Sequence, residues 1–394
     1  MTKQILSIIS ILALLSSGYG GGEKKVKSSV STQTSSQTSN DLATPAEEGG
    51  YGFDEIAKSL GYETYIWSEK DGTFFGDPNA VKGGTLNYIH SLFPRTMRII
   101  GQNSSQVLNS RTIGALCYES LLGRHSATFD FVPELASHWF ISDDKLTFKF
   151  RINPDARWSD GMPVVADDII ATWDLRMDET ILMPSEQLSF GKFERPVAES
   201  KYIVSVKAKV VNWRNFLYFS TMAIHPNHKL KELDGTAFLE EYAFSMIPGT
   251  GPYVIPEENK RNQESFTFVR RDNYWASDSP FKKYMFNFDK IKISVVKDND
   301  ALQFEKFKKG EQDIFSVNRS RRWVEETNFE STQKGWIKKQ RVFSERPAGT
   351  SGYFFNMRKW PFDDKRIRYA FTYLYDRVKM NQEMYYNEYG YMNS

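Results

Sequence analysis

The closely spaced histidines are the first candidates for chemistry in this chain. His225 and His228 are separated only by Pro226 and Asn227. A zinc site needs about four nitrogen, sulfur or oxygen ligands in fixed geometry, and this pair supplies half of such a set across a turn. We therefore interpret the pair as part of a surface loop, and we expect neither a bound metal nor a cofactor.

Adjacent carboxylates and a glycine-rich triplet suggest two other kinds of chemistry. Asp167 and Asp168 are neighbours in sequence, so on a helix they point to different faces and cannot flank a sugar as glycosidase carboxylates do. Capping of a helix N-terminus explains them better. The triplet Gly249–Gly251 resembles part of a phosphate loop, but Pro252 and Tyr253 follow it where a lysine is needed. Because no GxSxG, HExxH or Walker A pattern is present either, we expect a protein that is not an enzyme.

The single cysteine adds no reactive group. Cys117 lies in the apolar run IGALCYESLL, a setting that favours a small core residue over a nucleophile. One cysteine also cannot form a disulfide within the chain.

Composition narrows the class of protein. The 394 residues carry a net charge of only +2, so no broad basic face is expected and nucleic acid is excluded as a partner. Hydrophobic residues make up 40% of the chain and charged residues 25%, as in ordinary globular proteins. Aromatic residues reach 15%, and although most should lie in the core, some can line a groove that holds varied ligands.

The N-terminal region has the pattern of an exported protein. Lys3 precedes the apolar run Ile5–Leu15, which is too short to span a bilayer, and small residues at 16–18 suit cleavage. We assign residues 1–18 to a signal peptide. Residues 28–40 are almost entirely Ser, Thr, Gln and Asn, which cannot bury enough apolar surface to fold. Residues 19–49 are therefore predicted to be a disordered tether.

Beyond the tether, strand and helix patterns alternate, which predicts an α/β protein. Strands are expected at 85–89, 146–152, 203–211, 266–270 and 291–296. Helices are expected at 166–177, 237–244 and 300–309. A further helix from Asp363 to about Met380 carries an apolar face formed by Ile367, Ala370, Phe371 and Leu374.

An ordered series of short motifs resembles the family 5 extracellular solute-binding proteins, which are the oligopeptide and dipeptide receptors of ABC importers. The most distinctive run is KLTFKFRINPDARWSDGMPVVADDIIATW at 145–173. The others are DPNA at 77–80, which resembles the YejA-like branch, KGGTL at 82–86, YESLL at 118–122, PELA at 133–136 with Trp139, GTGPY at 249–253, NYW at 273–275, GEQDI at 310–314, FN at 355–356, PFDD at 361–364 and RIR at 366–368.

The resemblance implies a class II periplasmic binding protein fold with two lobes and an extra subdomain. It places the first part of lobe I at 50–125, the inserted subdomain at 126–215, the second part of lobe I at 216–345 and the start of lobe II at 346–394. Members of the family continue beyond the point that corresponds to Ser394. We therefore expect a C-terminally truncated chain with an incomplete second lobe and half of a binding cleft.

The resemblance also implies the function and the site. A peptide or peptide-like compound would be held in the periplasm by main-chain hydrogen bonds and delivered to the permease subunits of an ABC importer. The ligand-binding residues carried over are Tyr118, Glu119, Ser120, Leu121, Tyr353, Phe355 and Asn356.

Several alternatives stay open. Glu119 is either a partner for a positive group on the ligand or an exposed charge at a helix end. Relatives with the same fold bind a metal chelate or haem, so a chelate is the alternative ligand. We expect a monomer, and a lipid anchor is doubtful because no lipobox cysteine lies at the end of the signal peptide.

Overall fold

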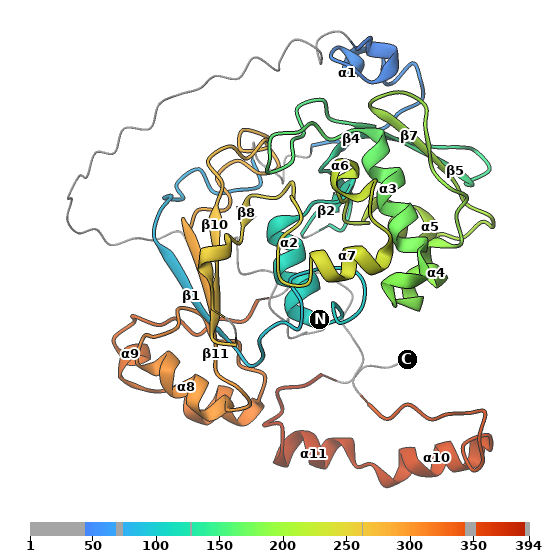
Figure 1. Cartoon of the computed structure of the whole chain (residues 1–394). Helices are drawn as coiled ribbons and strands as arrows, with labels where there is room; N and C mark the ends of the chain where they lie inside the picture. Colours follow the sequence, from blue (N-terminus) through green and yellow to red (C-terminus); the bar gives the residue numbers. More distant parts are fainter. Residues whose placement is uncertain (1–43, 68–73, 127, 262, 343–351, 391–394) are drawn as a thin grey trace, which may run out of the picture. The chain divides into compact units, whose positions relative to one another are not determined.

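The computed structural model describes residues 44–67, 74–126, 128–261, 263–342 and 352–390 (Figure 1). The predicted signal peptide and most of the predicted tether lie outside these residues. The described residues form two compact units. One, the N-terminal body, contains residues 44–125 and 130–300, and the other, the C-terminal unit, contains 301–390 together with the short segment around 126–129.

The first sheet of the N-terminal body joins segments from both ends of that unit (Figure 1). Its strands, in spatial order, are β1 (Thr85–His90), β11 (Lys290–Val295), β10 (Ser265–Arg270) and β8 (Tyr253–Val254), with β9 (Lys260–Arg261) also paired to β10. β1 and β11 run parallel, with Thr85 opposite Lys290, and the other pairs are antiparallel. The sheet therefore brings together strands that are 205 positions apart in the sequence, as the pairing of Thr85 with Lys290 shows.

The second sheet of this unit is antiparallel throughout. Its order is β4 (Ala136–Ile141), β5 (Thr147–Ile152), β7 (Ile203–Lys207) and β6 (Val197–Ala198). A two-stranded hairpin of β2 (Leu122–Arg124) and β3 (Phe131–Pro133) precedes it. Phe148, Phe150 and Ile152 of β5 are buried, as the alternating pattern predicts, and Phe216 stacks on Phe150 with ring centroids 5.6 Å apart.

Helices connect the strands of the N-terminal body. They are η3 (Ala46–Glu48), α1 (Phe53–Ile56), η5 (Leu108–Ile113), α2 (Gly114–Cys117), α3 (Ala166–Met177), η6 (Glu179–Ile181), α4 (Pro184–Phe190), α5 (Arg214–Ser220), α6 (Asn227–Leu230), α7 (Gly235–Glu241) and η7 (Glu257–Asn259). The capping role predicted for the adjacent aspartates is confirmed for Asp168. Its buried carboxylate accepts hydrogen bonds from the Val165 N–H at 2.8 Å and the Asn227 N–H at 2.7 Å, whereas Asp167 is exposed.

The C-terminal unit contains α8 (Asp300–Lys308), η8 (Arg322–Glu326), α9 (Glu330–Gln333), α10 (Lys365–Leu374) and α11 (Arg377–Glu383). Phe304 of α8 is buried between Phe315, 5.1 Å away, and Phe329, 6.1 Å away, measured between ring centroids. This aromatic cluster joins α8 to the segments that carry Phe315 and Phe329. The compact division therefore falls near residue 300, whereas the family resemblance placed the lobe boundary at 346.

Three predicted boundaries need correction. Residues 44–49 belong to the N-terminal body rather than to a disordered tether, because Arg151 donates hydrogen bonds to the carbonyls of Gly49 and Gly50 at 2.8 and 2.9 Å. The strand predicted at 203–211 ends at Lys207 as β7, since Val210 and Val211 point into solvent. The helix predicted at 363–380 is broken at Tyr375 and Asp376, and Asp376 caps α11 by accepting a hydrogen bond from the Lys379 N–H.

The apolar face of α10 is poorly covered in the C-terminal unit. Phe371 is 46% exposed and Leu374 is 81% exposed. Because few buried apolar contacts hold the helix, the amide protons of α10 should exchange with solvent faster than those of β5, whose alternate side chains are buried. Hydrogen exchange followed by mass spectrometry measures this difference, and equal protection of the two elements would contradict it.

Candidate functional site

The candidate ligand residues of the N-terminal body lie where α2 passes into β2. The main-chain groups of this passage are paired within the chain. The Glu119 carbonyl accepts from the Ile224 N–H at 3.1 Å, the Ser120 carbonyl from the Leu135 N–H at 3.1 Å, and the Leu121 carbonyl from the Ala136 N–H at 2.8 Å. The passage is thus held on both sides by other segments of the same unit.

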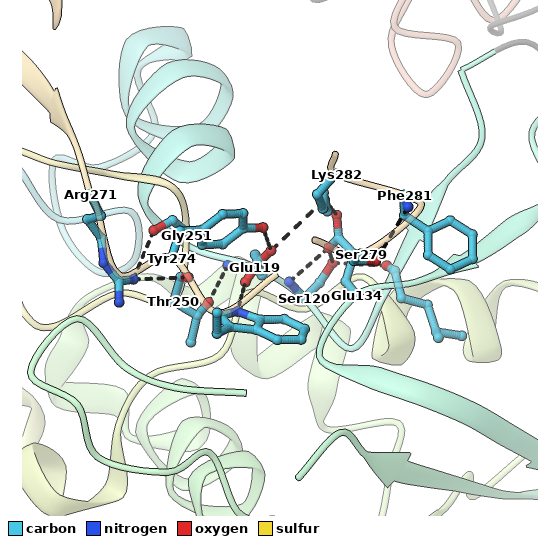
Figure 2. A network of polar contacts seen from close by, with 12 residues as sticks. Glu119, Ser120, Glu134, Thr250, Gly251, Arg271, Tyr274, Ser279, Phe281 and Lys282 are labelled. Atoms are coloured by element: carbon cyan, nitrogen blue, oxygen red, sulfur yellow. Dashed lines mark hydrogen bonds and ion pairs between the residues drawn. The ribbon is translucent and has the colours of Figure 1, made fainter. Parts of the chain in front are cut away.

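Within this passage, the side chain of Glu119 is buried, and the residue is 5% exposed (Figure 2). Tyr274 Oη donates a hydrogen bond to Glu119 Oε1 at 2.5 Å, and Trp275 Nε1 donates to Oε2 at 2.9 Å. The expectation of an exposed helix-end charge is therefore wrong. Both oxygens of this carboxylate are used in holding the 274–275 segment against the passage.

Glu134 and Lys282 extend the same polar network (Figure 2). Lys282 Nζ lies 2.9 Å from Glu134 Oε1 and 4.0 Å from Glu119 Oε1. Glu134 Oε2 in turn accepts hydrogen bonds from the Ser120 hydroxyl at 2.9 Å and the Ser120 N–H at 3.2 Å. One ammonium group thus faces two carboxylates in a region where little water is available to screen them.

Burial and the lysine shift the pKa values of this network in different directions. Burial raises the pKa of Glu119, and Lys282 only partly offsets that effect. Burial acts in the same sense on Glu134, but the charge and hydrogen bond of Lys282, together with the two hydrogen bonds from Ser120, outweigh burial and lower the pKa of Glu134. Burial alone would lower the pKa of Lys282, yet the two carboxylates together raise it. The network therefore favours a charged Lys282–Glu134 pair beside a carboxyl group that is easier to protonate.

The Gly249–Gly251 triplet serves packing rather than phosphate binding in this structure. The Thr250 hydroxyl accepts a hydrogen bond from the Glu119 N–H at 3.1 Å, and the Gly251 N–H donates to the Cys117 carbonyl at 3.0 Å. A Cβ at Gly249 would lie 1.9 Å from that carbonyl. Arg271 donates to the carbonyls of Thr250 and Gly251 at 3.2 and 3.0 Å, so the triplet is fixed from both sides.

Cys117 and the two histidines of the 225–228 segment lie close to the same passage, but they do not form a metal centre. Cys117 is 2% exposed, which confirms a core role, and burial raises its pKa. His225 is 1% exposed and stacks on Tyr118 with ring centroids 5.3 Å apart, so the surface-loop interpretation is wrong for this residue. His228 pairs with Asp160 at 2.7 Å. No group of three or more His, Cys, Asp or Glu residues suited to a metal ion occurs among the described residues.

Burial of His225 predicts an acid-sensitive fold. Burial and the nearby Arg176 lower the pKa of His225 to about 3, from an ordinary value of 6.5. Below pH 6.5 His225 therefore takes up a proton in the unfolded chain but stays neutral in the folded chain. The contribution of the neutral, buried His225 to the free energy of unfolding is present above pH 6.5 and is lost as the pH falls toward 3. The His225→Phe variant, which keeps the stacked ring, should flatten the acid limb of the stability curve by roughly 3 kcal/mol between pH 6.5 and 4. Urea unfolding at each pH measures this, with pH 8 as the internal reference, and an unchanged acid limb would contradict it.

The remaining candidate ligand residues belong to the C-terminal unit. Tyr353 is 83% exposed. Phe355 packs against Phe362 and Phe371 with ring centroids 4.8 and 5.3 Å apart, and the Asn356 side chain accepts a hydrogen bond from the Arg358 N–H at 3.2 Å. The predicted set is thus divided between the two units, and its exposed members are Tyr353 and Asn356.

Sequence reasoning missed the polar partners of Glu119. Tyr274 and Trp275 lie within the NYW motif, yet nothing in that motif indicates which carboxylate they bind. Lys282 is separated by 148 positions from Glu134, and no local period connects residues so far apart. Contacts between positions so far apart in sequence are revealed by co-variation among related chains, and a single sequence does not carry that signal.

Solved structures share the fold. The structure of Haemophilus influenzae OppA in complex with RPPGFSPFR matches with a TM-score of 0.57 at 20% identity, over 77% of this chain and 58% of that chain. NikA from Brucella suis in complex with Fe(III)-EDTA matches with a TM-score of 0.57 at 17% identity, over 77% and 57%. The architecture is therefore that of the α/β periplasmic binding proteins, which confirms the predicted fold class.

The sequence comparison identifies the family. Residues 130–394 match the model described as "Bacterial extracellular solute-binding proteins, family 5 Middle", and the chain belongs to this family. Peptidoglycan-binding protein YepA of Agrobacterium fabrum is 29% identical over 323 residues, which cover 78% of this chain and 51% of YepA. The YejA protein of Escherichia coli K12 is 26% identical over 269 residues, or 67% of this chain and 42% of YejA. The chain thus spans about half the length of the curated relatives it matches, and proteins of this family act outside the cytoplasm as solute-binding components.

Proposed function

We propose that this protein is the substrate-binding component of an ABC importer for peptides or peptide-like compounds. The observation that carries the proposal is the match of residues 130–394 to the family 5 solute-binding proteins. The name of one relative and the bound ligand of one solved structure support a peptide ligand. A relative from Agrobacterium fabrum, 25% identical over 337 residues, is named "Probable peptide-binding protein YejA", and OppA with the same fold was solved with the peptide RPPGFSPFR.

The two groups of candidate residues take different roles in this proposal. Tyr118, Glu119, Ser120 and Leu121 are paired inside the N-terminal body, so they act by positioning the segments that face the ligand. Tyr353, Phe355 and Asn356 are the residues that contact it, through their side chains and, as the family resemblance implies, through main-chain hydrogen bonds. Aromatic side chains offer large contact area without demanding one ligand sequence, which suits a receptor that accepts many peptides.

The cellular setting follows from the same proposal. The chain is exported by the signal peptide at residues 1–18 and acts in the periplasm as a monomer. The described residues contain no helix long and apolar enough to cross a membrane. The permease subunits of the importer are its protein partners, and nucleic acid is not a partner.

Ligand retained through purification tests this proposal. The protein is isolated from osmotically released periplasm, its N-terminus is sequenced, and acid-released small molecules are identified by mass spectrometry. We expect a chain that begins after about residue 18, together with a mixture of short peptides. Tyr353→Ser should reduce the peptide yield, while Tyr373→Ser, at a similarly exposed tyrosine (87%), should not. Recovery of a metal chelate or haem in place of peptides would favour the alternative ligand, and an intact Met1 chain in the cytoplasm would contradict export.

A further inference from the structure

The loop between β7 and α5 presents an apolar tip to solvent. It has the sequence KVVNWR at 209–214. Val210 is 73% exposed, Val211 is 58% exposed and Trp213 is 77% exposed. Single exposed apolar residues are common, but three within four positions form a contiguous patch that calls for a partner.

Hydrogen bonds hold this loop in one conformation. The side-chain amide of Asn215, itself 2% exposed, donates to the Val210 carbonyl at 2.8 Å. The Asn212 side chain accepts from the Arg214 N–H at 2.9 Å, and the Lys209 N–H donates to the Lys192 carbonyl at 2.8 Å. The apolar side chains are therefore fixed outward by the fold rather than exposed by chance.

Cations surround the apolar tip. Lys207, Lys209 and Arg214 are exposed and lie within the same short segment, and Lys192 is joined to it through the Lys209 N–H. Arg214 lies over the Trp213 ring, 4.8 Å from its centroid. Two exposed acidic residues lie near this segment: Glu194, whose N–H donates to the Lys207 carbonyl, and Asp144, whose carboxylate interacts electrostatically with Lys207. The net charge around the loop is therefore positive, whereas the net charge of the whole chain is only +2.

We propose that the 209–214 loop docks the protein on an anionic lipid surface. Tryptophan beside aliphatic side chains enters the boundary between headgroups and acyl chains, and lysine and arginine around them bind the anionic headgroups. A protruding loop with an apolar tip and a basic rim matches that layered chemistry better than it matches a flat protein interface, whose apolar centre is broader. This inference is independent of the ligand proposed above, because it uses none of the candidate ligand residues.

A local fluorescent probe tests the docking. Because Cys117 is buried, a Val211→Cys variant offers a selectively reactive thiol for an environment-sensitive dye such as NBD. Addition of vesicles that contain phosphatidylglycerol should shift the emission to the blue, and vesicles of phosphatidylcholine alone should not. The matched control places the dye at Val81, which is 83% exposed in the same unit, and its emission should stay constant. The apolar run near the N-terminus is common to both variants and cannot produce a difference between them.

Substitutions test the apolar tip and the basic residues around it separately. Trp213→Ser and Lys209→Glu should each weaken the co-sedimentation of the full chain with phosphatidylglycerol vesicles about fivefold or more. Trp336→Ser is the control, because Trp336 is 72% exposed and also lies near a lysine, with Lys334 Nζ 4.7 Å from its ring centroid. An unchanged dye spectrum at position 211, an equal shift at position 81, or equal binding by the Trp213 and Trp336 variants would overturn the proposal.

Discussion

Lys282→Met is expected to lower the free energy of unfolding by roughly 3–5 kcal/mol, as is typical when one partner of a buried ion pair is removed. The Lys282 side chain is 16% exposed and the Glu119 and Glu134 side chains are 4% and 18% exposed. Without the ammonium group, two carboxyl groups face each other in a dry region, and the Glu134 charge loses the contact at 2.9 Å. Chemical denaturation at neutral pH measures the loss.

Two further variants isolate the cause. Lys149→Met removes an ion pair of similar length, 2.8 Å to Glu199, whose side chains are 31% and 37% exposed, and it should cost at most about 1 kcal/mol. Adding Glu134→Gln to Lys282→Met should recover part of the lost stability, because the uncompensated charge is then removed. Equal losses for the Lys282 and Lys149 variants would show that the network contributes no more than a surface pair.

Methylation of peptide-backbone nitrogens is expected to weaken ligand binding about tenfold or more per blocked position that donates a hydrogen bond, since a buried acceptor on the protein then stays unpaired. Changes of ligand side chain should have smaller effects, because recognition through the main chain leaves the side-chain pockets permissive. Calorimetry with a series of short peptides, each methylated at one backbone nitrogen, measures both effects. Greater sensitivity to side chains than to backbone methylation would count against main-chain recognition.

The regular elements with clear periodicity were predictable from sequence. The 3.6-residue pattern places α3 at Ala166–Met177, and the alternating pattern of 147–152 gives β5. Predictions from local residue types were wrong where tertiary contacts determine the conformation of the backbone. Residues 44–49 are polar enough to be interpreted as tether, but the guanidinium of Arg151 fixes their backbone. The apolar character of Val210 and Val211 extended the prediction of β7 beyond the point where the strand leaves the sheet.

The candidate site was predictable only in part. The YESLL motif located Glu119, but its burial depends on Tyr274 and Trp275, which are 155 and 156 positions away. Such pairs are fixed by the path of the chain through both sheets, and a single sequence does not encode that path locally. The same holds for His225, whose burial against Tyr118 was not visible in the HPNH pattern.

The most direct test of the peptide-binding claim is calorimetric titration of the ligand-free protein with short peptides and, separately, with ferric EDTA and haem. We expect saturable heat with extended peptides of varied sequence and none with the chelate or haem. Tyr353→Ser should weaken the peptide signal and Tyr373→Ser should leave it unchanged. Saturable binding of the chelate or haem with no response to any peptide would contradict the central claim.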